Sequence, residues 1–178
     1  MYYKIIGRFG PQDGEKWLAY LEWRGLSLSS FDSVDANLRP DLFEPVSDED
    51  WDNCLNEDHK LGLITDLEYA RRILNRYQNA VLVGVESELE EGYAPRAGLL
   101  GFDILDNYCT VSLLTNWGTD KEDSISREMM PNALISDLGR ALQIRDLLRS
   151  KFAEDPHAGK CEVWAVYGVD TRLGPKTT

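Results

Sequence analysis

Three strand-length apolar segments follow one another along this chain without a helix between them. They lie at Ala80–Val85, Leu99–Leu105 and Tyr108–Leu114, and runs of this length bounded by turn residues are typical of strands. Such a segregated order differs from the strict alternation of strands and helices that builds a parallel sheet. The order therefore predicts an α+β fold, with a mainly antiparallel sheet and helices packed on one face.

Two further strands are predicted near the ends of the chain. Tyr2–Phe9 is aromatic and β-branched and is closed by Gly10-Pro11, and Cys161–Val169 is a second strand-length run. Between Leu99–Leu105 and Tyr108–Leu114 stands the dipeptide Asp106-Asn107, which tolerates positive φ and favours a tight hairpin.

Two amphipathic segments predict helices. Thr65 is the predicted N-cap of the first, with Glu68 three residues later as in a capping box, and this helix is expected to stop near Asn79. The longer helix has its apolar stripe from Leu134 to Phe152, and Asp155-Pro156 is expected to end it.

The remaining N-terminal region has weaker patterns. Glu15 to Gly25 suits a helix ended by Gly25 and also a half-buried strand, and we favour the helix. No period persists from Leu26 to Asn56, which predicts a long connection. With 178 residues, the chain is predicted to form a single α+β domain over residues 1–170 and a disordered tail at residues 171–178. The predicted core consists of Leu82, Leu100, Phe102, Ile104, Val111, Leu113, Leu134, Leu138, Leu142, Val163 and Ala165.

The charge balance restricts the classes of partner. The chain has 31 acidic and 19 basic residues and a formal net charge of −12, whereas domains that grip phosphate backbones concentrate lysine and arginine. We therefore expect no nucleic-acid partner. No apolar run is long enough for a membrane span, and the N-terminal apolar stretch is too short for a secretory signal, so we expect a soluble cytoplasmic protein without a membrane partner.

The acidic segment, which we define as Asp41 to Asp58, is the strongest candidate binding site. It holds eight acidic residues, no basic residue, and the aromatic residues Phe43 and Trp51. A large aromatic residue among steering charges is the composition of an interface anchor, although charge runs are also typical of solvated loops. A second candidate is Trp117, which stands beside Gly118 after a predicted strand. A tryptophan in this position suits the edge of a binding site, and it also suits a side chain that closes the end of the hydrophobic core. The predicted partner-binding residues are Asp48, Glu49, Asp50, Trp51, Asp52 and Trp117.

Residues that could carry catalysis or hold a metal are sparse. Cys54, His59, His157 and Cys161 are four ligands of the type that zinc prefers, but their spacings fit known ligand pairs loosely. Because of these loose spacings we expect no metal. Neither a Gly-x-Ser-x-Gly elbow nor a phosphate-binding glycine loop is present, and we expect no cofactor. The enzyme alternative is a small hydrolase or transferase that uses His59 or His157 with a nearby carboxylate, because histidine titrates near neutral pH.

Four segments of the second half carry a resemblance to known proteins. They are Leu99–Asp106, Ser112–Gly118, Asp155–Ala158 and Cys161–Tyr167. These segments resemble parts of small uncharacterised bacterial proteins of the toxin-immunity type, and they contain no catalytic motif. The resemblance implies a soluble binding protein that neutralises a toxin by presenting an acidic surface to a basic active site. The acidic segment lies outside the part of the chain that the resemblance covers.

Overall fold

The computed structural model describes residues 1–7, 63–76, 80–87, 89–107, 109, 111–115, 129–130 and 132–169. The predicted helix at residues 15–25, the connection at residues 26–56 and the tail at residues 171–178 lie outside this part of the chain. The single-domain boundary at residue 170 also falls outside it.

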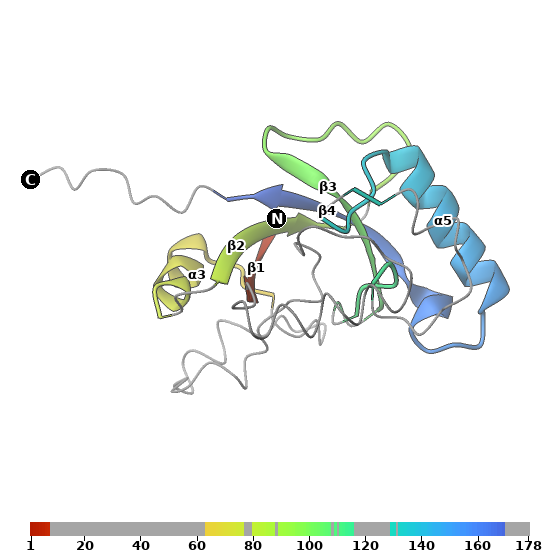
Figure 1. Cartoon of the computed structure of the whole chain (residues 1–178), viewed down its shortest axis with the longest axis horizontal. Coiled ribbons are helices and arrows are strands. Elements are labelled where there is room, and N and C mark those ends of the chain that lie inside the picture. The colour runs from red at the N-terminus through yellow and green to blue at the C-terminus, as the bar shows by residue number, and fades with distance from the viewer. Residues whose placement is uncertain are drawn as a thin grey trace, which may run out of the picture.

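A four-stranded antiparallel sheet forms the centre of the described structure (Figure 1). Its strands are β1 (Tyr2–Gly7), β2 (Ala80–Glu86), β3 (Leu99–Leu105) and β4 (Glu162–Gly168). The spatial order is β1-β2-β4-β3, so the last strand of the chain inserts between β2 and β3 and pairs with both. The predicted antiparallel sheet is confirmed.

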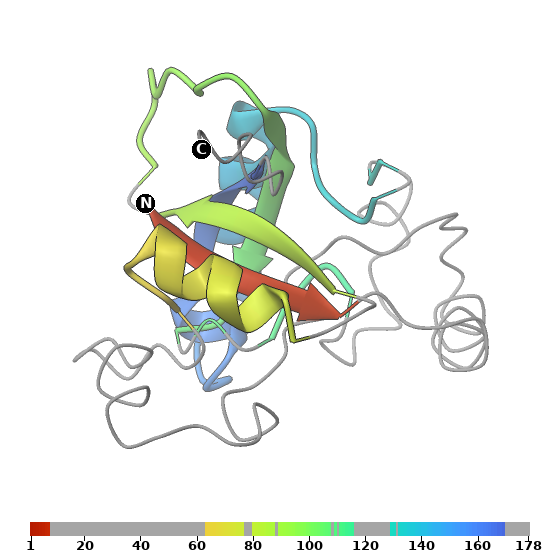
Figure 2. The same cartoon turned by 90° about the vertical axis from the view of Figure 1, so that its left-hand side faces the viewer.

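Helices α3 (Leu67–Leu74) and α5 (Leu138–Lys151) cover one face of this sheet. Leu82 packs against α3, and Gly84, two residues further along β2, pairs with Tyr167 of the cluster beneath α5. Because alternate residues of a strand point to the same side, both helices lie on that side, as predicted. Figures 1 and 2 show α3 beside β1 and β2, and α5 beside β3 and β4.

The opposite face of the sheet is also buried. Its apolar cluster consists of Ile6, Leu63, Val83, Val85, Leu105, Cys109, Leu134, Trp164 and Val166. Lys4 pairs with Val83 on this face, is fully buried, and donates from Nζ to the carbonyl oxygen of Cys109. Asp103 is equally buried and accepts hydrogen bonds from Ser112 Oγ at 2.6 Å and from the amide of Ile104 at 2.8 Å. These polar contacts tie the loop after β3 to the sheet.

The predicted core is confirmed for most of its members. The buried residues are Leu82, Phe102, Ile104, Leu113, Leu134, Val163 and Ala165. Leu100, Val111, Leu138 and Leu142 are partly buried and pack against the same clusters.

The prediction of a strand at Tyr108–Leu114 is wrong for the described residues of that segment. Ser112 forms an isolated bridge with Leu105, and the following residues form a turn. The amide of Leu113 donates to the carbonyl of Ile104 at 2.8 Å, while Cys109 adopts a positive φ of 55°. Isolated backbone hydrogen bonds of this kind hold the segment against the free edge of β3. They bury apolar side chains without forming the regular hydrogen-bond ladder of a paired strand.

The predicted start of the long helix is also wrong. Leu134 and Ile135 lie before it, and Ile135 instead exchanges two backbone hydrogen bonds with Phe102 of β3, at 2.8 and 2.9 Å. The N-cap is Asp137, whose side chain accepts from the amide of Arg140 at 2.7 Å. The helix ends at Lys151, before the predicted Asp155-Pro156 stop.

Helix α3 begins one residue later than predicted, because its N-cap is the residue after Thr65. The N-cap is Asp66, whose carboxylate accepts from the amide of Tyr69 at 2.6 Å, and the helix ends at Leu74 with Asn75 as its C-cap. The predicted capping box from Thr65 to Glu68 and the predicted stop near Asn79 are therefore wrong.

Asp66→Ala is expected to lower the free energy of unfolding by about 1 kcal/mol, because it leaves the amide of Tyr69 without its capping acceptor. Thr65→Ala, at the neighbouring exposed residue, is expected to change it by less than about 0.5 kcal/mol. Urea unfolding of both variants measures the difference. Equal losses would contradict the assignment of the cap to Asp66.

Candidate functional site

The residues predicted from the sequence to bind a partner lie outside the described part of the chain. This holds for Asp48, Glu49, Asp50, Trp51, Asp52 and Trp117, and also for Cys54 and His59. Their assignment stays a prediction. The described residues supply two other polar constellations, a pocket around Glu86 and a histidine–carboxylate pair.

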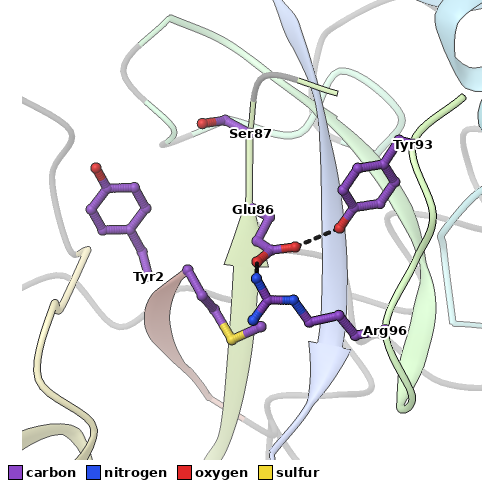
Figure 3. Close-up of a pocket in the computed structure, with 6 residues that line it drawn as sticks. Tyr2, Glu86, Ser87, Tyr93 and Arg96 are labelled. Atoms are coloured by element: carbon purple, nitrogen blue, oxygen red, sulfur yellow. Dashed lines mark hydrogen bonds and ion pairs between the residues drawn. The ribbon is translucent and has the colours of Figure 1, made fainter. Parts of the chain in front are cut away.

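The Glu86 pocket has a volume of about 350 Å³ and lies where β1 begins and β2 ends (Figure 3). It is lined by Met1, Tyr2, Glu86, Ser87, Tyr93 and Arg96. Antiparallel pairing of Tyr2 with Val85 brings the first residues of the chain beside the end of β2. The chain then turns through Gly92, which adopts a φ of +95°, and returns with Tyr93 and Arg96 beside Glu86.

The carboxylate of Glu86 is the centre of this pocket. Its Oε2 accepts a hydrogen bond from the hydroxyl of Tyr93 at 2.5 Å, and its Oε1 pairs with Nη2 of Arg96 at 2.9 Å (Figure 3). The Tyr93 hydroxyl also contacts the hydroxyl of the buried Tyr167 on β4. The Glu86 side chain is 12 % exposed, whereas the Arg96 side chain is 67 % exposed. The anionic partner is thus recessed and the cationic partner lies at the mouth.

The surroundings of Tyr93 keep its hydroxyl protonated. Burial raises the pKa of Tyr93 far above its ordinary value, and the hydrogen bond to the Glu86 carboxylate raises it further. An ionised phenol beside a carboxylate would place two negative charges in contact. At physiological pH the protonated hydroxyl of Tyr93 donates to the carboxylate of Glu86.

His157 and Asp106 form the second constellation. His157 Nδ1 lies 3.0 Å from Asp106 Oδ2, and the Asp106 side chain is fully buried while that of His157 is 41 % exposed. The Asp155 carboxylate holds this part of the chain by accepting from the amides of His157 and Ala158, both at 2.8 Å. A carboxylate on Nδ1 orients the imidazole and fixes its tautomer, which leaves Nε2 available to accept a proton.

Cys161, one of the four residues considered for zinc, lies in an environment that suits a neutral thiol. It is fully buried, and burial raises its pKa to about 11, whereas zinc binds the thiolate. Nδ1 of His157, another of the four, already contacts Asp106. Among the described residues, no group of three or more histidine, cysteine or acidic side chains is arranged to hold a metal ion.

Sequence patterns did not identify the Glu86 pocket, because the segment from Glu86 to Ala97 has only the composition of an acidic hairpin loop. Its organisation depends on the β1–β2 pairing and on Tyr167, which comes from a strand 74 residues beyond Tyr93. The sequence predicts His157 as a candidate catalytic residue together with a carboxylate that it does not specify. The carboxylate in contact with His157 is that of Asp106.

Comparisons of the chain with protein-family models, curated proteins and solved structures find no match. Within the part of the chain that the structure describes, neither α-helix has the length and the apolar character that a membrane span requires.

Proposed function

We propose that this chain is an acidic cytosolic protein that binds a basic protein through its acidic segment, and that the partner is a bacterial toxin which it neutralises. The observation that carries the proposal is the acidic segment itself, with eight carboxylates and no basic residue between Asp41 and Asp58. The resemblance of the second half to proteins of the toxin-immunity type supports the choice of partner.

Charge and aromatic contact have separate roles in this proposal. Clustered carboxylates accelerate the encounter with a cationic partner, but their field is screened beyond about 8 Å in physiological salt. Short-range binding energy therefore has to come from a desolvated side chain, and Trp51 is the large aromatic residue closest to the densest charge, Asp48 to Asp52. Trp117 is proposed as a further contact outside the acidic segment.

Trp51→Ala is expected to weaken partner binding by about 2 kcal/mol or more, which is roughly 30-fold in the dissociation constant, mainly through faster dissociation. Surface plasmon resonance with the purified partner measures both rate constants. Urea unfolding of the same variant is the control, because a tryptophan that plugs the core would instead lower the unfolding midpoint. A large loss of stability with unchanged binding kinetics would overturn the role of Trp51 as an anchor.

The contact between His157 and Asp106 favours a second candidate function, hydrolysis or group transfer with His157 Nε2 as general base. A buried carboxylate on Nδ1 and an exposed imidazole are the arrangement that general-base catalysis uses. The test is hydrolysis of p-nitrophenyl acetate by wild type, by His157→Gln and by His59→Gln, which replaces the other histidine of the chain. Activity that His157→Gln alone abolishes supports this function, and equal rates for all three proteins would overturn it.

A further inference from the structure

We propose that the Glu86 pocket is a receptor for a guanidinium or alkylammonium group, and that Arg96 occupies it as an internal substitute until an external cation displaces it. The external group is assigned as an arginine or lysine side chain of a protein partner. This choice of source rests on the proposed function, whereas the chemistry of the pocket is independent of it.

The pocket already binds the chemical group that we assign to it. Glu86 Oε1 pairs with the guanidinium of Arg96 at 2.9 Å, so the geometry for recognising a planar cation is in place. The second carboxylate oxygen is engaged by Tyr93, which orients the carboxylate with Oε1 toward Arg96 (Figure 3). A tyrosine hydroxyl is neutral at physiological pH, so the negative charge of the site resides on Glu86.

The exposure of the two partners explains why Arg96 can be displaced. The Glu86 side chain is recessed at 12 % exposure and is fixed by Tyr93, whereas the Arg96 side chain is 67 % exposed. Arg96 stands in a segment without regular secondary structure between Tyr93 and Gly98. An ion pair with so exposed a cation is typically weak. Breaking it therefore costs little free energy when a competing cation takes the place of Arg96.

The walls of the pocket fit an organic cation. The volume of about 350 Å³ lies at the lower end of the range for ligand sites, ~300–1,000 Å³. Tyr2 and Tyr93 contribute aromatic lining and Met1 contributes an apolar, polarisable side chain. Aromatic rings and a recessed carboxylate together favour a guanidinium over a small hydrated metal ion, since the guanidinium is weakly hydrated and stacks on rings.

The direct experiment is an NMR titration of the full chain with ethylguanidinium, following the amide signals of Glu86 and Tyr93. We expect wild type to bind with a dissociation constant on the order of 10 mM. Arg96→Ala removes the internal competitor and is expected to bind about two- to fivefold more tightly. Glu86→Gln keeps an acceptor for the Tyr93 hydroxyl but loses the charge, and is expected to bind about tenfold more weakly.

The matched control is Arg76→Ala, which removes the same charge from an exposed arginine. Arg76 precedes the first residue of β2, whereas Glu86 is its last residue, so this variant is expected to bind like wild type. A purely structural role for the Glu86–Arg96 pair does not predict tighter binding by Arg96→Ala. Absence of saturable binding in Arg96→Ala, or equal binding by Arg96→Ala and Arg76→Ala, would overturn the proposal.

A second titration distinguishes the source of the cation. A blocked Gly-Arg-Gly tripeptide is expected to bind at least as tightly as ethylguanidinium if the pocket receives a side chain. Binding of ethylguanidinium without binding of the tripeptide would overturn the side-chain assignment in favour of a free cation. Because both titrations use no protein partner, their failure is distinguishable from failure of the proposed function, which the binding kinetics of Trp51→Ala test.

Discussion

Gly101→Ala is expected to lower the free energy of unfolding by about 2–5 kcal/mol, a large part of the stability of an ordinary domain. Gly101 adopts a φ of +147°, and a Cβ built there would lie 2.6 Å from Cε of Met130, 2.8 Å from Cβ of Leu134 and 3.0 Å from the carbonyl oxygen of Ile135. Met130 can rotate away, but the other two atoms are held by the hydrogen bonds between Ile135 and Phe102. Backbone strain and overpacking therefore add.

Gly92→Ala is the matched control for this prediction. Gly92 also has a positive φ, of +95°, but a Cβ built there meets no atom within 4 Å. Only the strain of a positive φ in a residue with a Cβ remains, and this strain costs about 1 kcal/mol. Urea unfolding of both variants separates the two effects, and a loss for Gly101→Ala no larger than that for Gly92→Ala would show that the segment at Leu134 and Ile135 does not pack against β3 as described.

Replacing Asp48, Asp50 and Asp52 together by lysine is expected to slow association with the basic partner by about tenfold or more and to flatten its dependence on salt. Each exchange adds two charge units, so the formal net charge changes from −12 to −6. The dissociation rate is expected to change less, because steering acts before contact. Stopped-flow or surface plasmon resonance at several ionic strengths measures these quantities.

A triple variant with the same change of net charge provides the control for steering. Glu90, Glu91 and Glu154 are exposed residues outside the acidic segment, and their replacement by lysine is expected to slow association much less. Equal slowing by the two triple variants would mean that the net charge, and not the acidic segment, attracts the partner.

The strands were predictable where a single segment determines its own structure. Ala80–Val85 and Leu99–Leu105 are apolar runs that the sheet buries on both faces, and both form strands. Cys109, Leu113 and Leu114 are buried for another reason. The described part of this segment covers the edge of β3 through single hydrogen bonds. Leu134 and Ile135 continue the apolar spacing of α5, but Ile135 pairs with Phe102 of β3. No local pattern distinguishes an apolar residue buried by a helix from one buried against the edge of a strand.

The sites depend on contacts between distant parts of the chain. Glu86 and Tyr93 lie near each other in sequence, but their partner Tyr167 is brought to them by the pairing of β2 with β4. His157 and Asp106 are 51 residues apart and meet because the chain after β3 and the chain before β4 lie at the same end of the sheet. Sequence reasoning identified His157 as a candidate but had no means of selecting Asp106 from 31 acidic residues.

The central claim, that the acidic segment captures a basic protein, is tested most directly by comparing what two immobilised chains retain from a lysate of the native cells. One chain is wild type and the other carries lysine at Asp48, Asp50 and Asp52. We expect wild type to retain a basic protein at low salt and to release it at high salt, and we expect the variant not to retain it. Mass spectrometry identifies the retained protein. Retention of the same proteins by both chains, or a selectively retained protein that is acidic, would contradict it.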